Sequence, residues 1–382
     1  MARARLMDRP EDYARLGLKP DMIEQWEDGR RMPPTAGAFE WWYFDAILDD
    51  ETKVAIVFHT SAQNNAKDEI DHPDIQIRIT PPDGSEHPAE ARYLASEASF
   101  STTTCDVRIG PHRFSGDLTD YVIKVAPTEG LAADLRLHSL GSPYRPGTGY
   151  IGLGDSDENF FTWFCVVPRG EVSGTITIDG QTREVHGYGY HDHQWLDVNA
   201  MLTWNHWLWA RQSFDDHSLL LFDFVASERY GFKRFPICFV QDAEGKTIFE
   251  NHDTVDSTIV KSYVDDVSGK SYPETSRYVF DHGHSRLEYT LTATQKLEVR
   301  DIYKEAPEQI KKKLGSILGP LIGWIPAMLV RNKFDKEGIH PSYTRYGANG
   351  DLSLTIDNNT VERKGHLIYE YLFPGARFNP GK

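Results

Sequence analysis

The chain from about residue 41 onward is dominated by short runs in which hydrophobic and polar residues alternate. Residues 75–80 (Ile-Gln-Ile-Arg-Ile-Thr) alternate strictly, so their isoleucines fall on one face of a β-strand. The pair Asp179-Gly180, a favoured hairpin turn, separates residues 173–178 from residues 184–190. Further strands are predicted at residues 54–60, 160–167, 202–212, 219–226, 235–241, 246–250, 287–293, 352–356 and 365–372. This succession of strands indicates an all-β fold.

The length of 382 residues exceeds the roughly 250–300 residues at which one hydrophobic core stops growing, so two domains are expected. Residues 1–35 form a polar lead-in, with a short helix predicted from about Pro20 to Gly29. A boundary is expected near residues 200–215. We set it after residue 205, which gives an N-terminal β-domain at 36–205 and a C-terminal β-domain at 206–382. Because ligand pockets favour domain interfaces, we expect a site lined from both domains.

Residues 310–334 break the β pattern, because they contain an almost wholly apolar run from Leu314 to Val330 with basic residues on both sides. The run is shorter than the roughly 20 residues that a membrane-spanning helix needs, and Pro320 and Pro326 interrupt it. We predict an apolar helical insert packed over one end of a β-domain. The alternative is a peripheral membrane contact through Leu314 to Val330, with the flanking basic side chains at the interface.

Charge and cysteine content exclude several classes of protein. The net charge is −16 and there is no long basic stretch apart from Lys311–Lys313, which argues against nucleic-acid binding. The three cysteines form no CxxC pair, which indicates a reducing compartment. The first residues lack the apolar core of a signal peptide, so we expect a cytoplasmic protein, with membrane association as the alternative noted above.

The densest group of polar and aromatic residues is Gly-Tyr-Gly-Tyr-His-Asp-His-Gln-Trp at residues 187–195. Alternation along a strand places His191, His193 and Trp195 on one face, and Tyr190 and Asp192 on the other. The two histidines could ligate zinc. Neither an HExxH helix nor a CxxC pair accompanies them, so we expect no metal and no other cofactor.

Asp192 is the candidate catalytic acid. If it faces a pocket walled by aromatic side chains, burial raises its pKa above the ordinary value of about 3.9. A neutral carboxylic acid can then donate a proton to a weak base such as an alkene. We expect Tyr190 and His191 to orient this acid or the substrate. The alternative role for Asp192 is structural, as a carboxylate that ties down a turn or the adjacent backbone.

A second group of candidates is expected to bind the substrate. Asn205, Trp207 and Trp209 share one strand face, a mixture that suits a pocket better than a dry core. Trp42 and Trp195 would complete an aromatic wall able to stabilise a developing carbocation, although tryptophans can also simply fill a β-sandwich core.

Two further acids lie in aromatic strands and are added to the substrate-binding set. Asp223, between two phenylalanines, is either a functional acid or the buried partner of Arg211 or Arg234. Glu370 lies in the segment Gly-His-Leu-Ile-Tyr-Glu-Tyr at residues 365–371.

Three motifs resemble one known group. Residues 40–45 (Glu-Trp-Trp-Tyr-Phe-Asp), the segment 187–195 and the Trp-x-Trp-x-Arg strand at 207–211 are similar, in this order, to motifs of the lipocalin-like carotenoid 1,2-hydratase group. That group also includes attachment-protein-like bacterial lipocalins and fungal Diels–Alderases. This sequence departs from the pattern at Gln194, where asparagine is usual, and at Leu196, where glycine is common.

The resemblance implies an N-terminal β-sandwich-like domain and a C-terminal lipocalin-like barrel, with a pocket between or within them. It also implies a cofactor-independent hydratase, cyclase or isomerase that acts on a lipophilic isoprenoid or polyene metabolite by acid catalysis. A Diels–Alderase-type pericyclase, which holds a flexible polyene for cyclisation, is one alternative. A non-catalytic lipocalin-like carrier of a hydrophobic ligand is the other.

Overall fold

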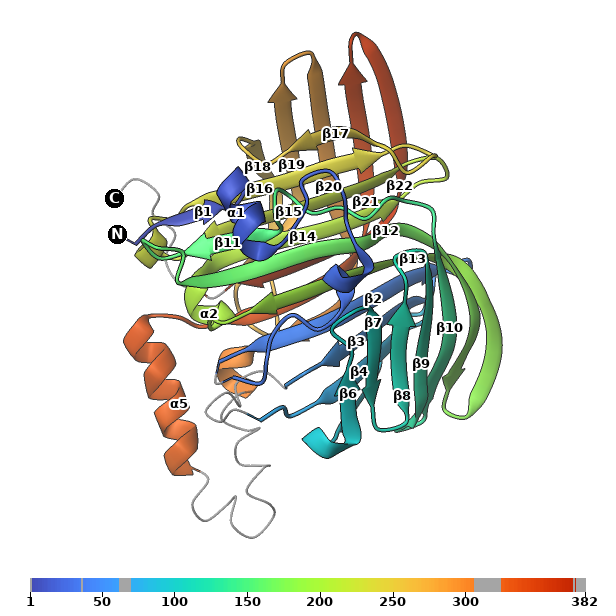
Figure 1. The fold of residues 1–382 in the computed structure, drawn as a ribbon. Coiled ribbons are helices and arrows are strands. Elements are labelled where there is room, and N and C mark those ends of the chain that lie inside the picture. The colour runs from blue at the N-terminus through green and yellow to red at the C-terminus, as the bar shows by residue number, and fades with distance from the viewer. Residues whose placement is uncertain (1, 36, 62–69, 306–323, 374, 376–382) are drawn as a thin grey trace.

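The protein consists of two large antiparallel sheets, each curled into a half-barrel (Figure 1). The structure is a computed structural model and describes residues 2–35, 37–61, 70–305, 324–373 and 375. The first sheet has 13 strands and the second has 9. The predicted all-β class is therefore confirmed.

The first sheet is built from β1 (Ala4–Leu6), β2 (Phe39–Leu48), β3 (Lys53–His59), β4 (Asp74–Thr80), β5 (His87–Arg92), β6 (Ala98–Phe100), β7 (Cys105–Ile109), β8 (His112–Gly116), β9 (Asp120–Thr128), β10 (Leu131–Ser139), β11 (Tyr150–Leu153), β12 (Asn159–Ile178) and β13 (Gln181–Leu196). Its strand order is β5-β4-β3-β2-β13-β12-β10-β9-β8-β7-β6, and β11 pairs with both β1 and β12. Two of the sequence motifs thus become neighbours, because β13 pairs with β2 in a register that sets Asp192 opposite Tyr43.

The second sheet is built from β14 (Trp204–Ser213), β15 (Ser218–Ala226), β16 (Arg234–Gln241), β17 (Thr247–Asn251), β18 (Asp256–Val264), β19 (Ser271–His282), β20 (Ser285–Arg300), β21 (Ser342–Ile356) and β22 (Asn359–Phe373). Its order is β17-β16-β15-β14-β22-β21-β20-β19-β18. The change from one sheet to the other falls between Leu196 and Trp204. The boundary set after residue 205 lies just inside β14.

The predicted turn Asp179-Gly180 joins β12 to β13. Both residues have positive φ angles, 49° and 79°, as a two-residue hairpin turn of this kind requires. The strands it joins are unusually long, with 20 and 16 residues, and they extend the sheet beyond the region that the second sheet covers (Figure 1).

In the described ranges the complete helices are α1 (Pro10–Leu16), α2 (Ala200–Thr203) and α5 (Trp324–Glu337), with single 3-10 turns at Gln25–Asp28, Ala95–Glu97 and Glu228–Tyr230. Residues 302–305 are also helical. The helix predicted from Pro20 to Gly29 is wrong except for the 3-10 turn. The helix forms earlier instead, where Pro10 occupies its first turn and Gly17, with φ of 69°, ends it.

The predicted apolar insert at 310–334 is only partly described. Residues 306–323 lie outside the described part of the chain, and α5 covers the rest. On α5, Met328 and Leu329 are 46% and 60% exposed. Within the described ranges, no helix has the length and apolar character needed to cross a membrane. Peripheral membrane contact stays a prediction.

Three hydrophobic clusters stabilise the fold. One fills the curl of the first sheet, one lies mainly between the sheets and one fills the curl of the second sheet. An ion pair crosses the middle cluster, where Arg211 of β14 meets Asp45 of β2, both at most 1% exposed. Tyr43 donates its hydroxyl to the same carboxylate at 2.8 Å. Two charges at this depth are tolerated only because they neutralise each other.

We predict that Arg211→Met destabilises the protein by about 3–5 kcal/mol, because it leaves Asp45 charged and without its counter-ion. Urea unfolding monitored by tryptophan fluorescence measures the change. The double variant Arg211→Met/Asp45→Asn removes both charges and should recover much of the loss. A double variant as unstable as the sum of the single variants would contradict this account of the interface.

Candidate active site between the two sheets

A cleft of about 160 Å³ lies between the two sheets. Strands β2, β3, β4 and β13 line it from one side, and β14, β15, β20, β21 and β22 line it from the other. The short helix α2, in the connection between the sheets, contributes Met201. The cleft thus draws on both halves of the chain.

Asp192 lines this cleft and is 1% exposed. Three donors point at its Oδ2 atom: the hydroxyl of Tyr190 at 2.8 Å, Nε1 of Trp163 at 3.1 Å and Nε2 of Gln194 at 3.1 Å. Burial raises the pKa of Asp192 to about 7, against the opposing effect of these hydrogen bonds. The carboxyl group is therefore poised to exchange a proton near neutral pH.

The hydrogen bonds also indicate which oxygen carries the proton. Oδ2 of Asp192 already accepts three hydrogen bonds, whereas Oδ1 receives only a longer contact from Gln194, at 3.2 Å. Burial keeps the Tyr190 phenol protonated by raising its pKa well above the ordinary value, so Tyr190 remains a donor to Oδ2. A proton on the carboxyl group consequently belongs on Oδ1.

The wall of the cleft opposite Asp192 is aromatic. Trp207 and Trp209 lie on the same face of β14 and both line the cleft. Trp209 meets the rings of Tyr43 and Tyr190 at centroid distances of 5.8 and 5.1 Å, and Trp207 meets Phe222 edge-on at 6.1 Å. These rings fix the wall rigidly, and their faces attract positive charge.

One part of the cleft is charged. Arg345 of β21 pairs with Glu370 of β22 at 2.8 Å and with Glu298 of β20 at 3.3 Å. Arg78 extends this chain of charges to the first sheet through Glu298, at 3.0 Å. Sequence analysis found only Glu370 of this group. The other members could not be predicted from the sequence, because strand register decides which residues meet. Glu298, Arg345 and Glu370 become cross-strand neighbours only when β20, β21 and β22 pair.

His191, Trp42 and Trp195 do not line the cleft. They point to the opposite face of the first sheet, because successive residues of a strand face opposite ways. His191 contacts the backbone oxygen of Tyr43 at 2.8 Å and Asp28 at 3.2 Å, so the expectation that it orients Asp192 or the substrate is not met by its position. Trp42 stacks on the imidazole of His193 at 4.5 Å.

Asp28 lies at the centre of a fully buried polar network on that opposite face. It accepts a hydrogen bond from Tyr121 at 2.7 Å and lies 3.4 Å from His193, whose other ring nitrogen contacts Glu40 at 2.8 Å. Burial would raise the pKa of Asp28, but the two neighbouring histidines lower it well below the ordinary value.

Asp28, Cys105 and His191 also present metal-ligand atoms within 4.8 Å of one another. Each of the three already has hydrogen-bond partners: Tyr121 for Asp28, the Phe114 carbonyl for Cys105 and the Tyr43 carbonyl for His191. We interpret the group as the hydrogen-bonded support that anchors the lead-in and β2 to β13.

Asn205 and Asp223 also lie away from the cleft. Asp223 forms a two-point ion pair with Arg234, with both contacts at 2.7 Å, which is one of the two alternatives left open by the sequence. Its neighbour Phe222 faces the cleft, so alternation turns Asp223 to the other side of β15. Asn205 Oδ1 lies 2.8 Å from the imidazole of His206.

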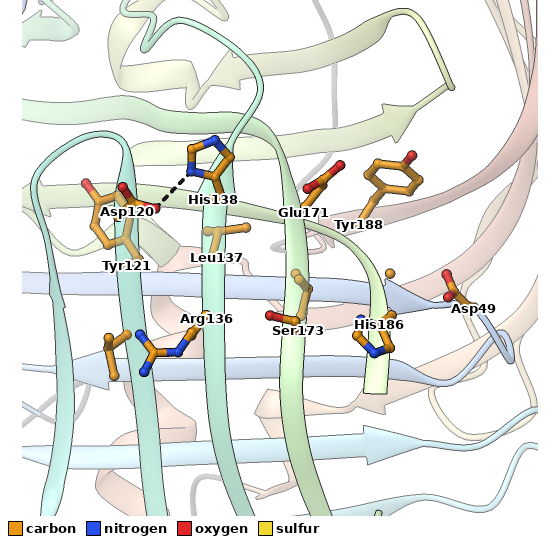
Figure 2. A pocket seen from close by; sticks show the side chains of 13 residues that line it. Asp49, Asp120, Tyr121, Arg136, Leu137, His138, Glu171, Ser173, His186 and Tyr188 are labelled. Carbon is orange, nitrogen blue, oxygen red and sulfur yellow. Dashed lines mark hydrogen bonds and ion pairs between the residues drawn. The ribbon is translucent and has the colours of Figure 1, made fainter. Parts of the chain in front are cut away.

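A larger, shallow hollow of about 520 Å³ lies on the outer part of the first sheet (Figure 2). Figure 2 shows its polar rim, in which His138 contacts Asp120 at 2.8 Å and Arg136, Glu171 and Tyr188 line the surface. The His138 and Asp120 side chains are 54% and 72% exposed. Because this hollow is open and polar, it lacks the buried surroundings that raise the pKa of Asp192 in the cleft.

We predict that Asp192→Asn stabilises the protein at neutral and alkaline pH. Asp192 ionises near pH 4 when unfolded but near pH 7 when folded, so wild-type stability falls as pH rises between these values. The penalty reaches at most about 4 kcal/mol, at 1.36 kcal/mol per pKa unit. Asparagine keeps the oxygen that accepts the three hydrogen bonds and removes the ionisation.

Thermal unfolding at pH 4.5 and pH 8 measures this difference. The variant should exceed wild type at pH 8 and approach it at the lower pH. Asp223→Asn is the matched control, and it should lose stability because it breaks the ion pair with Arg234. If Asp192→Asn is less stable than wild type at pH 8, Asp192 is a structural carboxylate.

Comparison with known proteins gives a consistent picture. A family model described as AttH-like matches residues 33–319. An AttH-type protein from Nitrosomonas europaea is 16% identical and superposes with a TM-score of 0.62, covering 94% of this chain and 98% of that one. CghA with Sch210972 is 14% identical, with a TM-score of 0.57 and the same coverages. No curated protein matches the chain significantly.

A third solved structure, kievitone hydratase from Nectria haematococca, is 13% identical and has a TM-score of 0.55, with 93% of each chain covered. Identities this low show a shared fold. The family model, in contrast, spans most of the sequence, including the motifs at 40–45, 187–195 and 207–211. The resemblance seen in those motifs is confirmed, and the chain belongs to the AttH-like family.

Proposed function

We propose that the protein is a cofactor-independent hydratase or cyclase that protonates an unsaturated lipophilic substrate, of the isoprenoid or polyene class, from Asp192. The observation that carries the proposal is the position of this carboxyl group. It lines a cleft with an aromatic wall, its Oδ2 is held by three donors, and its Oδ1 remains to carry the proton. A buried neutral acid beside an apolar ligand is the arrangement that alkene protonation needs.

The proposed reaction balances without a cofactor. The proton on Asp192 Oδ1 adds to one carbon of a double bond, and the π electrons form the new C–H bond, which leaves a cation on the neighbouring carbon. The faces of Trp207 and Trp209 attract that cation by roughly 1–2 kcal/mol each when water is excluded. Water adds to the cation and then gives up one proton to the Asp192 carboxylate. In a cyclisation, a second double bond attacks instead and moves the positive charge to another carbon. Loss of a neighbouring C–H proton to the carboxylate then forms a new double bond.

Two solved structures with this fold support the choice of reaction class. One is a hydratase by name, the kievitone hydratase of Nectria haematococca. The other, CghA, was determined with Sch210972. In this chain, the cleft between the two sheets offers an acid and aromatic rings together.

The test is incubation of the purified protein with a panel of isoprenoids and polyenes, followed by mass spectrometry. Hydration adds about 18 Da, the mass of one water, whereas cyclisation leaves the mass unchanged and alters the retention time. Asp192→Asn should bind the same compound and form product at least 100-fold more slowly, in the range that general acids contribute. A compound retained by wild type and never converted at any pH would instead indicate a lipocalin-like carrier. Cyclisation at full rate by Asp192→Asn would indicate a pericyclase.

We further predict that kcat/KM falls as pH rises above about 7, because the protonated form of Asp192 is the active one. Tyr190→Phe removes a hydrogen bond that favours the carboxylate, so it raises the pKa of Asp192 and moves the alkaline limb to higher pH. A shift of roughly 0.5–1 pH unit corresponds to one hydrogen bond of about 1 kcal/mol.

The matched control is Tyr289→Phe, which removes a buried hydroxyl from the core of the second sheet. It should leave the pH profile unchanged. The role of Asp192 would be contradicted if the alkaline limb of the pH profile moved to lower pH in Tyr190→Phe. It would also be contradicted if the limb moved by the same amount in Tyr289→Phe.

A further inference from the structure

A second, smaller cavity lies on the opposite face of β13 from the cleft. It has a volume of about 110 Å³ and is separated from the cleft by the sheet itself, because Trp195 lines the cavity whereas Asp192 and Gln194 line the cleft. Trp26, Tyr150 and Phe164 form the rest of its aromatic wall. Leu16 and Leu18 of the lead-in also line it. The remaining lining residues are polar: Glu27, Arg31, Arg145 and Thr148. Aromatic rings and polar side chains therefore share the wall of the cavity.

Arg31 is one of two arginines that line the cavity, and the other, Arg145, is paired with Glu27. Its Nε donates to the Gly29 carbonyl at 2.8 Å, one terminal nitrogen donates to the Thr102 carbonyl, and the guanidinium lies over the ring of Trp26 at 4.8 Å. Within the described ranges, no carboxylate oxygen comes within 4.0 Å of the guanidinium to form an ion pair. Burial lowers the pKa of Arg31, which is the mark of a desolvated cation.

The acids around Arg31 are held by other groups. Glu27 forms an ion pair with Arg145 at 2.8 Å. Glu40 accepts hydrogen bonds from the backbone nitrogens of Arg31 and Met32, at 2.6 and 2.8 Å, and contacts His193 at 2.8 Å. One nitrogen of the Arg31 guanidinium is thus left to donate to an incoming anion.

Tyr150 supplies a second donor at the cavity. Its oxygen accepts a hydrogen bond from Nε1 of Trp195 at 3.0 Å. Its own hydroxyl proton has no acceptor among the residues that the structure describes. Burial raises the pKa of Tyr150 to about 12, so the phenol keeps that proton at neutral pH. A guanidinium and a phenol can both donate hydrogen bonds to a carboxylate, and aromatic walls can pack against a flat ring. Together these groups suit an aromatic carboxylate.

We propose that this cavity is a second ligand site, which binds a small aromatic carboxylate of a single ring. The carboxylate would accept hydrogen bonds from Arg31 and Tyr150, and the ring would lie against Trp26, Trp195 and Phe164. The cavity measures about 110 Å³, less than the roughly 150 Å³ of an apolar cavity that holds benzene, so it excludes a ligand of more than one ring. It lies partly open, and the part of the ligand that it does not enclose would extend into the opening. The site is independent of the reaction proposed for the cleft.

Benzoate is the probe, and its binding to the full-length protein is followed by isothermal titration calorimetry. We expect saturable binding of one benzoate per chain. Benzyl alcohol, which has the ring without the charge, should bind wild type at least tenfold more weakly than benzoate does. Benzoate should likewise bind the Arg31→Gln variant at least tenfold more weakly than it binds wild type. Arg31→Lys keeps the charge and should retain most of the affinity if the residue acts by charge rather than by supporting the fold.

Two cleft variants separate this site from the proposed active site. Asp192→Asn and Trp209→Phe should bind benzoate as wild type does, since both residues lie on the other side of β13. Absence of saturable binding, or equal affinity for benzyl alcohol, would overturn the proposal. The proposal would also be overturned if Trp209→Phe weakened benzoate binding and Arg31→Gln did not, because the ligand would then lie in the cleft.

Discussion

The burial of the Asp192 carboxyl group is the constraint on which this account depends. A carboxylate at that depth is costly in an interior of low polarity, and three donors on one oxygen do not offset the cost, so the proton stays until about pH 7. The second sheet causes this burial. Without β14 and β15 against it, Asp192 would face water and ionise like any surface aspartate. The packing of the two sheets therefore gives Asp192 the raised pKa that a general acid needs near neutral pH.

The same strand carries a second set of buried polar side chains, which is organised differently. On the face of β13 turned away from the cleft, His191 and His193 alternate with two carboxylates, Asp28 and Glu40. There each carboxylate contacts a histidine ring, and the network holds the lead-in against the first sheet. Because successive side chains of β13 face opposite ways, the structural network lies on one face of the strand and the acid Asp192 on the other.

Local patterns were sufficient to predict the all-β class, the Asp179-Gly180 hairpin and the opposite facing of His191 and Asp192, because each depends on a few neighbouring residues. The charged part of the cleft could not be predicted, since Glu298 and Arg345 meet only through strand pairing. Trp42 and Trp195 were misplaced for a related reason. Both belong to the face of His193, and composition alone does not tell which face of the first sheet meets the second.

The most direct test of the central claim is a carbon-13 NMR titration of the aspartate side-chain carboxyl groups, with Asp192→Asn used to assign the resonance. The account predicts that the Asp192 signal titrates near pH 7 in the folded protein, well apart from the surface aspartates. A signal that is already ionised at pH 5 would show that Asp192 is an ordinary carboxylate. The acid would then have to be sought elsewhere or the reaction explained without one.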